Sequence, residues 1–171
     1  MIKSVLVWFA VVNLLLLACS ATKPPAPNSV SGLSLVMKLS LEELVVQSDL
    51  IVVGAVTGQR SQWNTQHNQI HTLVTVNVEE WVRGEPKGDE IIIKISGGQV
   101  DEVSQVVEDA PSFRVGEKLL VFLQSQESDT VSVVGGWQGK LVIENDKIAG
   151  SDVSLTELIK QIKAQSSKSS G

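Results

Sequence analysis

Side chains with reactive groups are sparse in this sequence, and their spacing does not assemble a catalytic centre. His67 and His71 stand four residues apart, which on a helix would place both on one face and within reach of one metal ion. They fall instead in a polar loop that leads into an expected strand, so we expect exposed histidines and no metal site. Glu79 and Glu80 are neighbours on that strand and face opposite sides. With no Gly-x-Ser-x-Gly motif either, we expect no enzyme activity and no cofactor.

The only cysteine, Cys19, lies where an apolar run ends and a proline-rich stretch begins. The run from Val5 to Ala18 is shorter than the roughly twenty apolar residues that span a bilayer. It is apolar on every side, so it does not have the polar face of an amphipathic surface helix. Lys3 before the run and a small residue at its end are typical of a secretory signal peptide.

The end of this run, Leu16-Leu17-Ala18-Cys19, resembles the lipobox of bacterial lipoproteins. The resemblance implies cleavage between Ala18 and Cys19, diacylglycerol on the thiol, and acylation of the new amino group. The membrane would then be a partner, reached through the acyl chains on Cys19. Ser20 stands where an aspartate commonly retains lipoproteins in the inner membrane, which favours the outer membrane in a bacterium that has two. The alternative is an ordinary cleaved signal with an incidental cysteine.

These observations divide the chain into four parts. Residues 1–18 are expected to be the signal peptide, 19–39 the acylated cysteine and a Pro/Ser-rich tether, 40–165 a folded domain, and 166–171 a polar tail. A chain of this size buries enough surface for a core of its own without disulfides. The net charge of −5 and the absence of a Lys/Arg cluster argue against a nucleic-acid partner.

Two capping boxes, Ser40 to Glu43 and Ser154 to Glu157, predict a short helix at each end of the domain. Between them, β-branched runs and period-two alternation predict short strands. The expected strands cover 50–57, 70–79, 90–96, 118–124, 130–134 and 140–144. The segment 100–110 allows a helix, a strand or a loop, and its flanking Gly97-Gly98 and Pro111 favour extended structure. Five or six strands with short turns predict a barrel.

Four segments carry a family resemblance, Ser48–Gly54, Val78–Gly84, Ile95–Gly98 and Phe113–Leu123. Together they resemble secreted bacterial domains of unknown function whose OB-type barrel is similar to netrin-like modules and tissue inhibitors of metalloproteinases. The likeness extends roughly from Leu41 to Glu144. It implies a mainly β protein, a small OB-like or netrin-like barrel of five to six strands with a short N-terminal helix and a C-terminal helix. None of these motifs implies a catalytic residue.

Two tryptophans, Trp63 and Trp137, lie in expected loops, where an exposed indole can bind a ligand or a partner. The alternative for both is packing across the mouth of the barrel. The sequence thus predicts a lipid-anchored protein of the bacterial cell envelope that acts as a non-catalytic binding or scaffolding module. Its partner would be another envelope protein or a glycan. A regulator or inhibitor of an envelope protease is the alternative function, by analogy of fold alone.

Overall fold

The structure is a computed structural model that describes residues 38–86, 88–126 and 129–168. The expected signal peptide, the cleavage site at Ala18 and Cys19, and the tether as far as residue 37 lie outside these ranges. In chain order, the elements are α1 (Leu41–Gln47), β1 (Leu50–Trp63), β2 (Ile70–Arg83), β3 (Glu90–Ser96), β4 (Gly98–Val100), β5 (Val103–Gln105), β6 (Lys118–Ser125), β7 (Thr130–Val133), the 3-10 turn η1 (Gly136–Gly139), β8 (Lys140–Glu144), β9 (Lys147–Ile148) and α2 (Leu155–Lys168).

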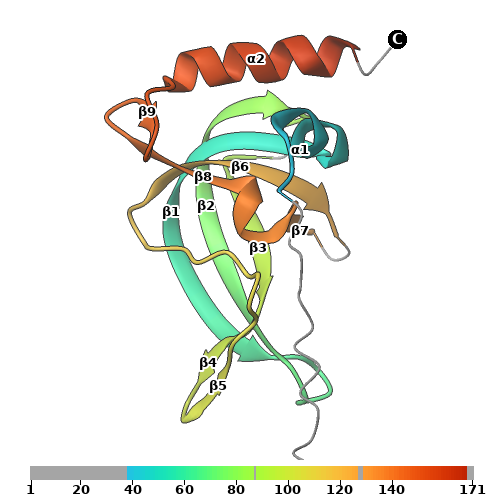
Figure 1. Ribbon diagram of the computed structural model, residues 1–171. Helices are drawn as coiled ribbons and strands as arrows, with labels where there is room; N and C mark the ends of the chain where they lie inside the picture. Colours follow the sequence, from blue (N-terminus) through green and yellow to red (C-terminus); the bar gives the residue numbers. More distant parts are fainter. Residues whose placement is uncertain (1–37, 87, 127–128, 169–171) are drawn as a thin grey trace, which may run out of the picture. The chain divides into compact units, whose positions relative to one another are not determined.

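Five of the strands close into a ring, in the order β1-β2-β3-β7-β6 and back to β1 (Figure 1). All neighbours in this ring are antiparallel except β3 and β7, which run parallel and pair at only two positions. Strands β8 and β9 extend the sheet beyond β6. The expected OB-like barrel with a helix at each end is therefore confirmed.

The first half of β1, residues 50–56, and most of β6 are apolar on both faces because both faces are covered. On β1, Val52 points into the barrel, whereas Ile51 and Val53 point outward toward the helices. On β6, Val121 faces inward, and Phe122 faces outward and is fully buried. Because both faces are buried, these two segments are continuous hydrophobic runs in the sequence. A half-exposed strand would instead alternate between apolar and polar residues.

The outer layer of this core is supplied by the two helices, which lie at the same end of the barrel (Figure 1). Helix α1 begins with the predicted capping box, in which Ser40 and Glu43 satisfy each other's backbone N–H groups. This interaction also lowers the pKa of Glu43, because the carboxylate accepts hydrogen bonds from the backbone and side chain of Ser40. At α2, Ser154 Oγ accepts from the Glu157 N–H at 3.2 Å, while the Glu157 carboxylate accepts from Gln161.

Helix α2 continues to Lys168, into the segment 166–171 that the sequence assigns to a polar tail. The hydroxyl of Ser166 donates to the carbonyl of Ile162, one turn earlier, at 3.0 Å. The hydroxyl of Ser167 donates to the carbonyls of Lys163 and Ala164. Serine hydroxyls can donate to carbonyls of the preceding turn inside a helix. The polar character of Ser166 and Ser167 therefore did not show where the helix ends.

Closing the ring requires β1 to bend sharply, and the β1–β2 pairing shifts register at three points. Thr57 on β1 and Glu79 and Val82 on β2 are the residues without a partner at these shifts. Extra residues of this kind bend and twist a strand locally. Gly54 lies beside one of them, and a Cβ there would meet the Asn77 carbonyl oxygen at 2.3 Å. The glycine thus permits close backbone approach at the bend.

The segment after β3 forms a small antiparallel hairpin, β4–β5, which resolves the open assignment of 100–110 in part as extended structure. The hairpin docks on the distal end of β1–β2. The side chain of Gln105 accepts from the Ile70 N–H at 2.5 Å. Ser61 and Thr72 share a hydroxyl hydrogen bond of 2.9 Å, and Thr72 also donates to the Gly97 carbonyl. Polar contacts therefore cover the inner face at this end.

We expect Gly54→Ala to lower the free energy of unfolding by about 2 kcal/mol or more, because the added Cβ overlaps the Asn77 carbonyl. Gly58→Ala is the matched control on the same strand, since nothing lies within 4 Å of its Cβ position. That variant should leave stability unchanged or raise it by up to about 1 kcal/mol. Urea denaturation of both variants measures the difference. Equal losses would contradict the assigned role of Gly54.

Candidate functional site

A groove of about 530 Å³ lies over the outer face of β2 and β3, between the β1–β2 turn and the β6–β7 turn. Its lining is polar, with one apolar side chain at its floor. The lining residues are Gln62, Thr65, His71, Leu73, Lys94, Gln126 and Thr130. A volume of this size accommodates a small ligand or a few linked residues of a longer one.

Strand register places these side chains in rows across the sheet. One row runs through Gln62, His71 and Ser96, which are partners across the three strands. The next row runs through Arg60, Leu73 and Lys94 in the same way. Since cross-strand partners share a face, all six side chains project on the outer side of β1, β2 and β3.

The β1–β2 turn that forms one wall is held by Asn64. Its side-chain oxygen accepts from the N–H groups of Asn68 and Gln69, at 3.0 and 3.2 Å. Its own N–H donates to the Gln69 carbonyl at 2.8 Å. His67 adopts a positive φ of 54° within this turn, and its ring stacks on Trp63 with centroids 6.4 Å apart. The wall of the groove is thus fixed from within the turn.

The opposite wall is tied to the start of β1. Asp49 accepts from the Ser125 N–H at 2.9 Å, and its own N–H donates to the Leu123 carbonyl. Asp49 lies between α1 and β1, and its carboxylate fastens the end of β6. Gln126 continues this wall, because its N–H donates to the Thr130 carbonyl and closes the β6–β7 turn.

The groove has a basic electrostatic character. Burial lowers the pKa of His71, and the positive charge of Lys94 lowers it further, so both effects favour the neutral ring. Lys94 forms no ion pair with any residue that the structure describes, whereas Lys118, Lys140 and Lys163 each pair with a glutamate. The groove therefore holds an unpaired cation beside a neutral imidazole.

The residues that the sequence considered for chemistry are kept apart. His67 lies in the turn and His71 on the outer face of β2, and no group of three His, Cys, Asp or Glu side chains in the described ranges could hold a metal ion. Glu79 pairs with Lys118 on β6 at 2.8 Å, whereas Glu80 pairs with Lys163 on α2 at 3.1 Å. The two adjacent glutamates thus form ion pairs with two different elements, as expected for neighbours on a strand that face opposite sides.

The two tryptophans also lie in different places, and neither lines the groove. Trp63 is the last residue of β1, where its partner is the buried Ile70, so its half-buried side chain lies on the face opposite Gln62 and His71. Trp137 lies in η1 and is 54% exposed. Of the two, Trp137 is the more accessible to a partner.

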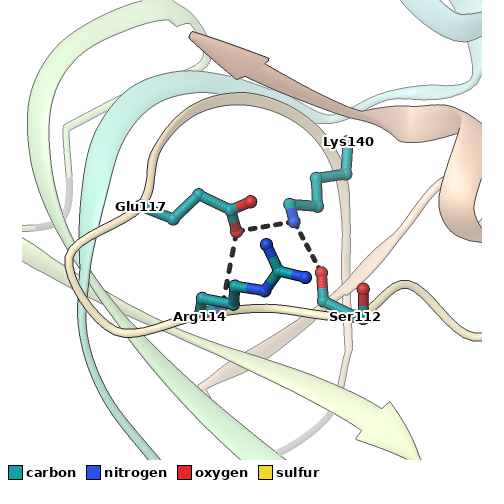
Figure 2. Close-up of polar contacts among 4 residues, drawn as sticks. All are labelled: Ser112, Arg114, Glu117 and Lys140. Atoms are coloured by element: carbon teal, nitrogen blue, oxygen red, sulfur yellow. Dashed lines mark hydrogen bonds and ion pairs between the residues drawn. The ribbon is translucent and has the colours of Figure 1, made fainter. Parts of the chain in front are cut away.

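A second polar cluster lies at the 111–117 loop, where Lys140 reaches from β8 (Figure 2). Its Nζ lies 2.6 Å from a Glu117 oxygen, donates to the Ser112 carbonyl at 2.5 Å and lies 4.8 Å from the centre of the Phe113 ring. The Arg114 N–H donates to the same Glu117 oxygen. The Lys140 and Glu117 side chains are only 10% and 14% exposed. This cluster fastens the loop that carries Phe113 into the barrel core.

We expect Glu117→Gln and Lys140→Met each to lower stability by about 3 kcal/mol, because each leaves the other charge poorly solvated and unpaired. The double variant should lose less than the sum of the two, with a coupling of about 1–3 kcal/mol. Urea denaturation of the four proteins gives this double-mutant cycle. Additive losses would mean that the ion pair does not hold the loop.

The fold and the groove define a small OB-like barrel with a polar surface site. No protein-family model matches the sequence, and no curated protein matches it significantly. Within the described part of the chain, no helix is long and apolar enough to span a membrane.

The sequence did not predict the groove, although it did indicate that some of the residues that line it face outward from strands. The alternation from Ile70 to Glu79 already placed His71 and Leu73 on one face of a strand. Lys94 interrupts a run of isoleucines on the next strand, which also indicates an outward-facing position. What the sequence did not provide was the register that puts Lys94 opposite Leu73.

Proposed function

We propose that this protein is a lipid-anchored, non-catalytic binding module of the bacterial cell envelope, and that its ligand binds in the groove over β2 and β3. The observation that carries the proposal is the groove itself. It is open, polar and bounded by two turns that hydrogen bonds hold in place. A site with hydrogen-bonded walls and an accessible floor suits recognition of a polar ligand.

The position of the groove agrees with the way OB-type barrels are used. In these folds, ligands bind over the second and third strands, between the turn after the first strand and the turn before the last strand of the ring. In this chain those strands are β2 and β3, and the turns are β1–β2 and β6–β7. This correspondence is one of fold alone, so the chemistry of the lining residues must carry the argument.

The lining residues favour binding over catalysis. Gln62, Thr65 and Gln126 offer amide and hydroxyl groups, which donate and accept hydrogen bonds without titrating. His71 and Lys94 are the titratable side chains in the described lining, which has no carboxylate or thiol to work with them. In a binding module, these amide and hydroxyl groups would form hydrogen bonds with the ligand and take no part in a reaction.

The proposed anchor rests on the lipobox-like residues that end at Cys19. Two or three acyl chains on this residue would hold the protein stably at a membrane, where a single chain would not. The Pro/Ser-rich tether would space the barrel from the bilayer, and Ser20 favours the outer membrane in a two-membrane bacterium. The groove would then face the envelope space around the anchor site.

The anchor is tested by intact mass and fractionation of the mature protein beside a Cys19→Ala variant, both expressed in a bacterium that processes lipoproteins. We expect the wild type in the membrane fraction with a mass that fits an acylated chain beginning at Cys19. The variant should lose the acyl mass, since it has no thiol to modify. An unmodified thiol with a soluble wild type would overturn the anchor and leave the groove to be tested alone.

The groove is tested by co-sedimentation of the mature protein with envelope fragments from which lipid has been extracted. Leu73→Glu places a charge at the floor of the groove and should lower the bound fraction roughly fivefold or more. Val153→Glu makes the same change at an exposed position outside the groove and should bind as the wild type does. If Trp137→Ala abolishes binding while Leu73→Glu does not, the η1 surface carries the function and the groove assignment is wrong.

A further inference from the structure

Positive charge gathers on the groove face of a protein whose net charge is −5. The charged or titratable side chains in the two rows across this face are Arg60, His71 and Lys94, all basic. Neither Arg60 nor Lys94 has an ion-pair partner among the described residues. Elsewhere, the lysines of β6, β8 and β9 are all paired with carboxylates. Neighbouring cations without counter-charges repel one another, and an anion between them would relieve that repulsion.

The register places these three groups around one side chain. Leu73 has Arg60 opposite it on β1 and Lys94 opposite it on β3. His71, two residues earlier on β2, is diagonal to both, at the roughly 7–8 Å that separates diagonal neighbours in a sheet. Flexible arginine and lysine side chains can span such distances, so all three can converge on one anionic group above Leu73.

No carboxylate of the described residues lies in these two rows. Glu90 lies opposite Asn77, further along the sheet, and Glu79 and Glu80 are already paired. The β6–β7 turn contributes one described carboxylate, Asp129. Neither Asp129 nor Arg60 is among the residues that line the groove, but Arg60 shares the outer face of the sheet with Leu73 and Lys94. Among the described residues, the charged groups around His71 are therefore Lys94 and Arg60 on the sheet, with Asp129 on the neighbouring turn.

The uncharged part of the lining indicates what the anion is attached to. Gln62, Thr65 and Gln126 suit the hydroxyl groups of a sugar, which both donate and accept hydrogen bonds. Single-stranded nucleic acid is disfavoured, because no Phe, Tyr or Trp side chain lines the described part of the groove to stack on a base, and Trp63 lies on the other face. The volume of about 530 Å³ suits two or three sugar rings.

We propose that the groove binds an acidic oligosaccharide, with Lys94 and Arg60 on its anionic group and Gln62, Thr65 and Gln126 on its hydroxyls. This inference rests on the proposed binding function and names the ligand class for the same site. Protonation of His71 adds a third positive charge at the anionic group, so affinity rises as the pH falls through the pKa of His71.

The test is an NMR titration of the mature protein in non-ionic detergent with trigalacturonic acid, with the uncharged trisaccharide of galactose as the comparison. The chain has two histidines, so the ring signals of His71 and His67 can both be followed. Trigalacturonic acid should raise the pKa of His71, because its carboxylates offset the charge of Lys94. His67 lies in the turn, outside the lining, and serves as the internal control.

Lys94→Gln should weaken trigalacturonic acid binding roughly tenfold or more, as expected for loss of a charge-assisted contact. Arg60→Gln should weaken it to a smaller degree, whereas Lys160→Gln, an exposed unpaired lysine on α2, should leave it unchanged. Asp129→Asn should leave it unchanged or strengthen it.

Each alternative result has a distinct meaning. Equal binding of the two trisaccharides would overturn the anionic class while leaving the groove as a binding site. Tighter binding of a hexaglutamate peptide would overturn the sugar and make the ligand an acidic peptide. No binding of any probe would overturn the inference. The co-sedimentation of the Leu73→Glu variant would still decide the proposed function independently.

Discussion

The structure depends on one constraint, namely that β1 must pair with two strands at once. Its first six residues, 50–55, pair with β6 on one edge, and nearly its whole length pairs with β2 on the other. Both edges and both faces of this segment are therefore occupied, which explains why it is the most uniformly apolar stretch of the domain. The bend that brings the two partners together needs the register shifts and the absent side chain at Gly54.

The groove is a direct result of the same arrangement. From Val56 onward, β1 no longer pairs with β6, so the distal half of β1–β2 extends past the ring. Its inner face is covered by the β4–β5 hairpin, and its outer face stays accessible beside the β6–β7 turn. The proposed binding site thus lies on a part of β1–β2 that does not pair with β6. The site chemistry can vary there with little effect on the core.

The fold was predictable from the sequence because its signals are local. Capping boxes, β-branched runs and turn glycines each act over a few residues and agree with one another. The end of β1 was not predictable in this way. The strand was expected to stop at Thr57, yet it continues through Gly58 to Trp63, since its polar residues are satisfied by Thr72 and the docked hairpin. The site required the register between strands, and a single unpaired residue, Thr57, reverses which side chains of β1 face the groove.

The double pairing of β1 also has a consequence for how the chain folds. The partner of its first half, β6, lies more than 60 residues further along the sequence. During synthesis, β1, β2 and β3 are complete while the apolar edge at 50–55 still lacks its neighbour. Contacts over such separations close slowly, and an open apolar edge is prone to pair with other chains. Until β6 pairs with it, the edge at 50–55 is therefore the part of the sheet most exposed to pairing with other chains.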